Sequence, residues 1–386
     1  MPLLYPLTFV FLMGASVGSF LNVCIARLPL EKSLLWPGSR CGHCLQPIRW
    51  YDNLPLLSYW LLRGRCRVCG ARFSARYFLI ELFTALGFVG LYYLEVVANV
   101  HHVDAQLLAR DSYEWAPGLW VGRHDIARVV IFLYHAVLFS FLLVASFCDL
   151  DRQAIPLSLT VTGTVVGLVG AVVFAWPWPY RPGQVLAGIY PRHYALYPWP
   201  VWSPLPGWLE PGGNWQTGLA TGVAGMLAGT LILRAVRLLF GLGVGAEYME
   251  PEEPEAEPAA TWPGGRWLGW LQRVGGRALG LGDADLMMMA GSFLGWQPIL
   301  VAFFIGVFPG LLFGLVHLAL RGNRPMPFGP ALAVGIVITW LAWDWIGPRY
   351  ELFFFSSTFL LVAVVVSCVG MLLAAFVLRL LRWARR

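Results

Sequence analysis

Long apolar runs, separated by polar or proline-rich segments, follow one another through most of this 386-residue chain. A helix needs roughly 20 apolar residues to span the hydrocarbon core of a bilayer. The apolar positions are continuous and do not alternate, which indicates helices, since lipid leaves no backbone polar group unpaired. The predicted spans lie at 3–24, 77–97, 127–147, 155–175, 217–240, 286–296, 299–320, 331–345 and 353–378.

The run at 286–296 is short for a full crossing, so the pattern leaves eight or nine transmembrane helices. It can tilt, re-enter the membrane, or continue past Pro298 as one kinked helix with the next run. The first run lacks a basic n-region and an A-x-A-like cleavage site, so we expect a retained helix and not a signal peptide. The pattern therefore predicts an all-α polytopic membrane protein.

Composition and charge support this class and suggest an orientation. The chain is 58% hydrophobic and 12% charged, whereas soluble domains are about 25% charged. The segment 27–76 holds nine Lys and Arg residues against Glu31 and Asp52. Cytoplasmic loops carry such an excess, so we place this segment in the cytoplasm. No basic stripe on a soluble module is visible, so nucleic-acid binding is not expected.

Four of the seven cysteines lie in this basic segment as two C-x-x-C pairs, Cys41 with Cys44 and Cys66 with Cys69. Each C-x-x-C turn directs two thiolates at one centre, and two such turns complete a tetrahedron around Zn²⁺. Two disulfides are one alternative, which a reducing compartment disfavours, and redox-active or free thiols are another. Because four protein ligands leave no open position, we expect a structural zinc site.

Two pairs of aspartates border apolar runs, where charge is costly and often functional. Asp149 and Asp151 lie at the end of one run, and Asp283 and Asp285 lie at the start of another. Two carboxyl groups a few ångströms apart share one proton and titrate as a unit. One member can then take a proton from water while the other polarises a scissile carbonyl, as in aspartic proteases.

Gly280 and Gly282 precede Asp283 and leave room for close approach of a partner helix or an extended substrate. A purely structural interpretation is also available, because an aspartate is favourable at a helix N-terminus. The residue pattern alone leaves the catalytic and the capping interpretation open.

Further motifs occur in a fixed order along the chain. G-S-F-L-N-V lies within 14–29, and P-F-G-P lies at 327–330. Three further segments accompany the C-x-x-C pairs: 53–60 and 63–66 come after the first pair and lead into the second, and 76–81 comes after the second. Asp149 lies seven residues before Pro156, and Asp283 completes G-x-G-D. Together these motifs resemble the prepilin peptidase family, the type IV leader peptidases of the GxGD aspartic class, over almost the whole chain.

The resemblance implies an aspartic endopeptidase of the bacterial cytoplasmic (inner) membrane, with its active site on the cytoplasmic side. Its substrates are the short basic leaders of type IV prepilins and type II secretion pseudopilins. The family's catalytic pair corresponds to Asp149 and Asp283, with Gly280, Gly282, Asp151 and Asp285 in support. Many members of the family also methylate the new N-terminus with S-adenosylmethionine. The implied partners are these substrates and the lipid bilayer.

The chain departs from the family pattern at Asp285, where the family usually has Lys, and at Leu157, where it often has an acid. It also has extra residues at 98–126, 176–216 and 241–265 and at the C-terminus. Two other functions stay open: a proton or cation transporter, and an inactive pilus-assembly scaffold. No internal repeat of the kind that many transporters contain is visible.

The predicted organisation follows from these assignments. A first transmembrane helix leads into a cytoplasmic zinc-binding domain, transmembrane helices with the first catalytic aspartate, a Trp/Pro-rich extracytoplasmic loop, a peptidase core with the GxGD motif, and a last helix with a basic tail. The corresponding ranges are 1–26, 27–76, 77–175, 176–216, 217–345 and 346–386.

Overall fold

The computed structural model divides the chain into two compact units, Met1–Gly163 with Trp178–Pro191, and Thr164–Pro177 with Arg192–Arg386. The boundary falls inside one helix, α6 (Leu157–Val173). The structure describes residues 3–101, 123–173, 215–244, 281–321 and 327–349, together with helical positions 358–359, 361–366, 368–370 and 373. Most of the loops predicted at 176–216 and 241–265, and most of the span predicted at 353–378, lie outside the described residues, while 215–216 and 241–244 belong to a helix.

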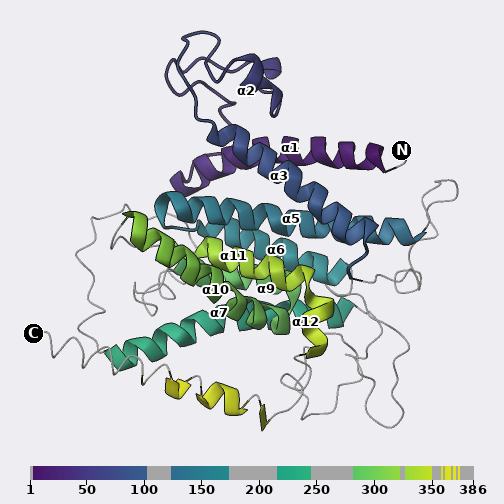
Figure 1. Cartoon of the computed structure of the whole chain (residues 1–386), viewed down its shortest axis with the longest axis vertical. Helices are drawn as coiled ribbons and strands as arrows, with labels where there is room; N and C mark the ends of the chain where they lie inside the picture. The colour runs from purple at the N-terminus through teal and green to yellow at the C-terminus, as the bar shows by residue number, and fades with distance from the viewer. Residues whose placement is uncertain are drawn as a thin grey trace, which may run out of the picture. The chain divides into compact units, whose positions relative to one another are not determined.

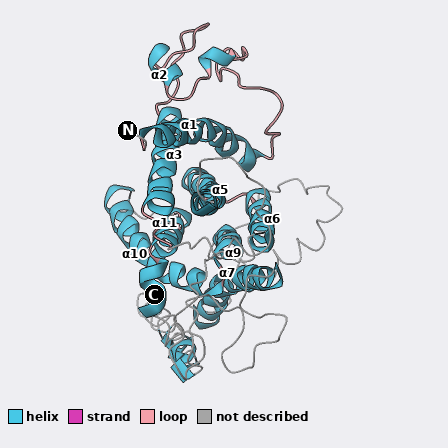
Figure 2. Cartoon of the chain, turned by 90° about the vertical axis from the view of Figure 1, so that its right-hand side faces the viewer, coloured by secondary structure: helices cyan, strands magenta, loops and turns pink. Residues whose placement is uncertain are grey.

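Helices make up nearly all regular structure in this part of the chain, and Figure 2 shows helices and loops but no strand among the described residues. Among the described residues, five helices are long and apolar enough to cross a membrane. They are Leu4–Leu30, Arg76–Val97, Arg128–Arg152, Gly218–Val236 and Trp296–Gly314. The predicted helical class is thus confirmed, with helices able to span a membrane, while the total of eight or nine spans stays a prediction.

The first unit is a group of long helices with a small lobe inserted between two of them. In Figure 1, α1, α3 and α5 lie side by side, as their mutual contacts require. The elements, in chain order, are α1 (Leu4–Arg27), η1 (Leu28–Leu30), η2 (Trp50–Asp52), α2 (Leu57–Leu61), α3 (Arg76–Tyr92), the π-helix η3 (Tyr93–Val97), α5 (Arg123–Arg152) and the start of α6.

Two glycines one helical turn apart let α1 and α3 approach closely. A Cβ added at Gly14 would lie 2.8 Å from the Cα of Ala85, and one at Gly18 would lie 2.8 Å from the Cα of Glu81. Small residues at this spacing are typical of close helix packing in membranes. Asn22, one turn further along, donates to the backbone oxygen of Tyr77 at 3.1 Å. The sequence signature around 14–22 is therefore a helix-packing surface.

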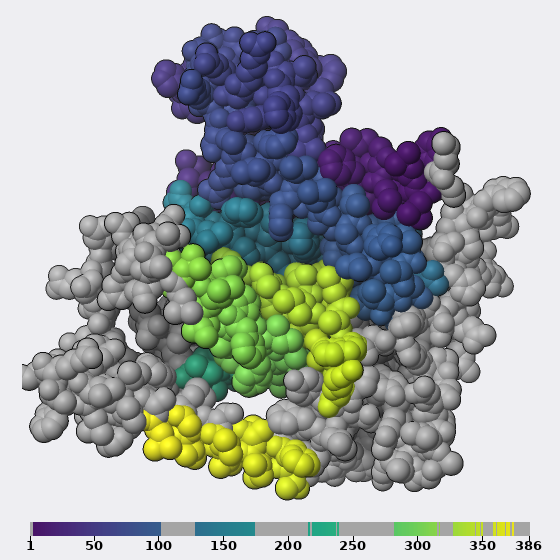
Figure 3. Space-filling view, in the orientation of Figure 1, coloured from purple at the N-terminus to yellow at the C-terminus, as the bar shows by residue number. Residues whose placement is uncertain are grey.

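The lobe consists of residues 28–75 and stands beyond the N-terminal end of α3, as the purple-to-blue atoms at the top of Figure 3 show. Its small core is aromatic and includes the start of α3, because the Tyr59 ring contacts Phe73 of the lobe and Phe78 of α3 at centroid distances of 5.6 and 5.4 Å. One tether to the helices is polar: the Leu56 N–H donates to Glu81 Oε2 of α3 at 2.7 Å.

The second unit contains the end of α6, then α7 (Trp215–Val244), α9 (Leu281–Leu294), α10 (Trp296–Arg321), α11 (Gly329–Leu341) and α12 (Trp343–Arg349). The α7 helix packs against α9 and α10, and α10 packs against α11. The predicted run at 331–345 divides into α11 and α12.

The short run predicted at 286–296 belongs to α9, a separate helix of 14 residues. Gly295 has φ of 85° and interrupts the chain between α9 and α10. The two runs are therefore not one kinked helix. At 1.5 Å per residue, α9 is about 21 Å long, which is shorter than a bilayer core of about 30 Å.

Glycines also join α7 to α9 at very short range. A Cβ at Gly225 would overlap the backbone oxygen of Gly291, and a Cβ at Gly229 would overlap that of Met287. From Gly225 to Gly229 the position advances by four residues in α7, while the contacted residue moves back by four in α9, from Gly291 to Met287. The two helices therefore run antiparallel. Continuing this register by one turn places residues 233–234 of α7 level with 283 of α9.

Candidate functional site

The four predicted metal ligands come together in the lobe of the first unit. Cys41 Sγ lies 3.8 Å from Cys69 Sγ, and Cys44 Sγ lies 4.0 Å from Cys66 Sγ. Ligands in a tetrahedral site with Zn–S bonds of about 2.3 Å are separated by about 3.8 Å. None of the four is in a disulfide, so the spacing fits a metal-bound set and these four can hold a metal ion.

Backbone groups of the first C-x-x-C turn favour the thiolate that a metal requires. Hydrogen bonds from the backbone of Cys44 and His43 lower the pKa of Cys41 to about 6, and the His43 N–H lies 3.4 Å from Cys41 Sγ. At Cys69, a backbone hydrogen bond from Ala71 favours the thiolate, but desolvation and the other cysteine side chains outweigh it and raise the pKa of Cys69 to about 11. Crowded sulfurs resist carrying several negative charges unless a cation shares the site.

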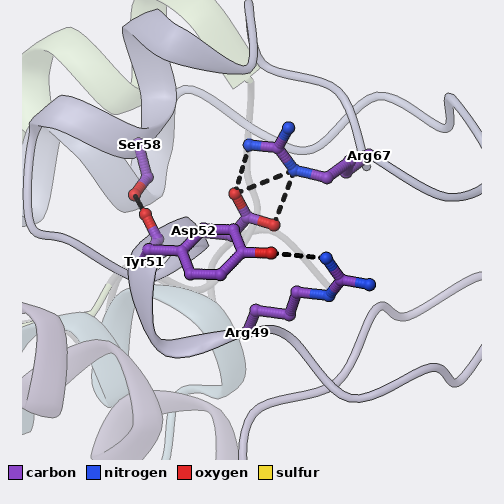
Figure 4. A network of polar contacts seen from close by, with 5 residues as sticks. All are labelled: Arg49, Tyr51, Asp52, Ser58 and Arg67. Atoms are coloured by element: carbon purple, nitrogen blue, oxygen red, sulfur yellow. Dashed lines mark hydrogen bonds and ion pairs between the residues drawn. The ribbon is translucent and has the colours of Figure 1, made fainter.

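An ion pair connects the second C-x-x-C turn to η2 (Figure 4). Arg67 lies between Cys66 and Val68, and its Nε and Nη2 donate to the Asp52 carboxylate at 2.6–3.0 Å. The hydrogen bonds from Arg67 hold the pKa of Asp52 below its usual value. The Asp52 side chain is 8% exposed. This bidentate contact fixes the turn that carries Cys66 and Cys69.

Asp149 lies in the last turn of α5 and is 6% exposed. It shares the buried face of the helix with Ala145 and Cys148, as the helical spacing of four and one residues requires. The helix ends just beyond it, where Gln153 takes φ of 54° and its N–H bonds to the Asp149 backbone oxygen. A carboxyl group is thus buried next to a helix end.

Asp151, two residues on, points to a different partner. Its carboxylate accepts two hydrogen bonds from the Arg76 guanidinium, at 2.8 and 2.6 Å. Arg76 also lies over the Phe147 ring, 5.1 Å from its centroid. Asp151 therefore joins the end of α5 to the start of α3, and its predicted support of catalysis stays a prediction.

Asp283 lies in the first turn of α9 and is 8% exposed. Ala284, Leu286 and Met287 around it are buried. Gly282 is part of the same turn, while Gly280 lies outside the described residues. Asp149 belongs to the first unit and Asp283 to the second, so their predicted meeting as a proton-sharing pair stays a prediction.

Asp285 has a cationic neighbour that the sequence analysis missed. The Arg234 guanidinium of α7 interacts electrostatically with the Asp285 carboxylate, in agreement with the helix register set by the α7–α9 glycines. Within the part of the chain that the structure describes, Arg234 Nε is buried without a hydrogen-bond partner. The acid at position 285 is therefore accompanied by an arginine from the adjacent helix.

A second cluster was also missed, although its signal was available. Glu95 and His135 are ionisable residues inside predicted spans, and such residues are functional candidates by default. With His101 they form a buried group whose ligand atoms lie within 4.8 Å of one another. Nothing in the spacing of residues 95, 101 and 135 shows that they meet.

Comparison with known families gives one domain match. Residues 12–94 match the model of the bacterial peptidase A24 N-terminal domain. This range covers most of α1, the cysteine lobe and α3, which are the elements joined by the Gly14, Gly18 and Glu81 contacts.

Relatives extend the similarity over most of the chain. A prepilin leader peptidase/N-methyltransferase of Aeromonas salmonicida is 28% identical over 89% of this chain and 92% of its own length. The protein of that name from Klebsiella pneumoniae is 31% identical and aligns over 52% of this chain and 87% of its own length. The Myxococcus xanthus protein is 39% identical, but the match spans only 42% of this chain and 38% of that relative. No solved structure matches the chain.

Proposed function

The chain belongs to the prepilin leader peptidase/N-methyltransferase family, and on that basis we propose that it removes the leader peptide from type IV prepilins or type II secretion pseudopilins. The observation that supports this most directly is the placement of Asp149 and Asp283, each buried in a terminal turn of a helix. Buried carboxyl groups at such positions are expensive in a membrane protein and are commonly functional.

In the proposed reaction, Asp149 and Asp283 share one proton. The ionised member takes a proton from water, whose oxygen attacks the scissile carbonyl carbon, while the protonated member donates to the carbonyl oxygen. Collapse of the tetrahedral intermediate breaks the C–N bond, and the amine leaves with a proton from the pair. No covalent bond to the protein forms, and no metal takes part.

The substrate and the orientation fit each other in this proposal. A prepilin leader is short and basic and precedes a hydrophobic helix, so its cleavage site lies at the membrane surface. The positive-inside bias of residues 27–76 places that side of the chain in the bacterial cytoplasm. Both aspartates would act at this cytoplasmic edge of the inner membrane.

The lobe would hold a structural Zn²⁺ through Cys41, Cys44, Cys66 and Cys69. A lobe with a small aromatic core gains stability from such an ion, because metal binding energy becomes folding energy when the site exists only in the folded chain. The Asp52–Arg67 pair would then orient one C-x-x-C turn toward the ion.

Methylation of the new N-terminal amine would be the second activity, and S-adenosylmethionine would supply the methyl group. No residue is assigned to this donor.

The test is cleavage of a purified prepilin by the full-length protein in detergent, measured as the change in gel mobility of the pilin. Asp149→Asn and Asp283→Asn should each reduce the rate by at least about 10²–10⁴-fold, the usual contribution of a general acid or base. Glu31→Gln changes an exposed acid of the lobe and should leave the rate unchanged.

Cleavage retained in either aspartate variant would refute the assigned pair. No cleavage by the unaltered chain would favour an inactive assembly scaffold instead. The mass of the cleaved pilin, with and without added S-adenosylmethionine, tests methylation separately from the peptidase.

A further inference from the structure

One carboxylate and two imidazoles form a buried cluster in the first unit, apart from the residues assigned above. Glu95 belongs to the π-helix η3, His101 follows it after a short turn, and His135 lies in α5. Their side chains are 1%, 2% and 1% exposed. Glu95 and His135 are 40 positions apart in the sequence, so the fold and not local spacing brings them together.

Both imidazoles approach the same carboxylate oxygen. His135 Nδ1 lies 2.8 Å from Glu95 Oε1, and His101 Nε2 lies 3.3 Å from it. The two rings are 5.6 Å apart between centroids and nearly perpendicular, at 70°. Three potential ligand atoms from three segments therefore converge on one small volume.

The spacing is close to that of a tetrahedral metal site. With metal–ligand bonds of about 2.0–2.1 Å to imidazole and carboxylate, adjacent ligand atoms are separated by about 3.3–3.4 Å. The His101–Glu95 separation has that value, and the His135–Glu95 separation is about half an ångström shorter. Small side-chain rotations would admit an ion between all three.

The surroundings make a cation favourable. Leu91, Phe132 and Leu138 are at most 4% exposed and belong to the two helices that carry the cluster, and both helices are candidate membrane spans. An ionised carboxylate in such a setting is costly unless a positive charge compensates it. Two imidazoles and one glutamate are a known zinc ligand set, and this mixture of nitrogen and oxygen donors suits borderline divalent ions.

The backbone at the cluster is irregular, as is frequent at functional sites. Glu95 is presented by a π-helix, a conformation that is rare and often found where a protein binds something. Asn99, between Glu95 and His101, has φ of 49°, in a region that costs energy for most residues. This turn directs the chain back so that His101 meets Glu95.

We propose that Glu95, His101 and His135 form a second metal site, with Zn²⁺ the best-matched ion, that clamps η3, the π-helix following α3, to the middle of α5. Three protein ligands leave one position for water. His135 is fourteen residues from Asp149 in the same helix, which corresponds to about 21 Å. The site is therefore separate from the proposed catalytic residue and does not depend on peptidase activity.

Metal content of the full-length protein, purified in detergent and dialysed, provides the test. Elemental analysis should find two zinc ions per chain in the unaltered protein and one in Glu95→Gln. The double variant Cys66→Ser/Cys69→Ser should also hold one. Glu81→Gln is the matched control, since Glu81 is a partly buried glutamate of α3 that bonds to Leu56, and it should retain two.

A second measurement protects the test against misfolding of Glu95→Gln. In the double cysteine variant, added Co²⁺ should give the visible absorption of a nitrogen- and oxygen-ligated ion without thiolate charge-transfer bands, and His101→Gln should abolish it. One zinc ion per chain in the unaltered protein, or no cobalt absorption in the double cysteine variant, would overturn the proposal. The cluster would then be a hydrogen-bonded His–Glu–His network without a metal.

Discussion

Replacing Gly18 by alanine tests whether close packing of α1 against α3 supports the first unit. The new Cβ would lie 2.8 Å from the Cα of Glu81 and 3.0 Å from the side chain of Thr84. Ordinary contacts begin at 3.4 Å, so the helices must separate by about 0.6 Å. A gap of about 0.5–1 Å forfeits a quarter to a half of the dispersion energy of the atoms along it.

Two effects of the substitution oppose each other. Overpacking typically costs about 1–3 kcal/mol, whereas Gly→Ala in a helix interior gains about 1 kcal/mol from backbone propensity. We expect Gly18→Ala to lower the free energy of unfolding by about 1 kcal/mol net. Gly90 provides the matched control, because it is exposed on α3 and an added Cβ meets nothing within 4 Å. Gly90→Ala should therefore be neutral or stabilising by up to about 1 kcal/mol.

The assay is thermal unfolding of both variants in the same detergent, followed by circular dichroism. The difference between Gly18→Ala and Gly90→Ala cancels most of the propensity gain and leaves the overlap, about 1–3 kcal/mol. Equal midpoints for the two variants would refute the argument that the α1–α3 contact leaves no room for a methyl group.

Two further predictions concern charged pairs. Because Arg67 lowers the pKa of Asp52 in the folded lobe, the pair stabilises the lobe above the unfolded pKa of about 4, and this stabilisation is lost as pH falls through the lower folded pKa. At pH 7, amide hydrogen exchange of residues 49–67 should therefore show less protection in Asp52→Asn than in the unaltered chain, and the two proteins should converge at acid pH. A difference in protection that stays constant with pH would contradict this prediction. Asp285→Asn should lower thermal stability, because it leaves the Arg234 charge uncompensated. Adding Arg234→Gln should restore part of that stability, with a coupling free energy between the two substitutions of about 0.5–3 kcal/mol. Strictly additive effects would show that the two side chains do not interact.

Local features of the sequence were sufficient for the helical class, for most helix positions and for the four-cysteine cluster. Apolar run length reports the membrane span directly, and a C-x-x-C turn holds its two sulfurs together with little help from the rest of the chain. Helix ends were harder to place, since the π-helix after Tyr92 and the break at Gly295 depend on backbone conformations that hydropathy does not record.

The sequence by itself thus determined the membrane class, the family and the cysteine set, because each of these depends on residues that are close together or on motifs of fixed spacing. Only the tertiary structure brought Glu95 to His135, and Arg234 to Asp285. Those pairs are 40 and 51 positions apart, and their meeting depends on how glycine-lined helix faces come into register. That register is a property of two packed surfaces, so no pattern along one stretch of chain contains it.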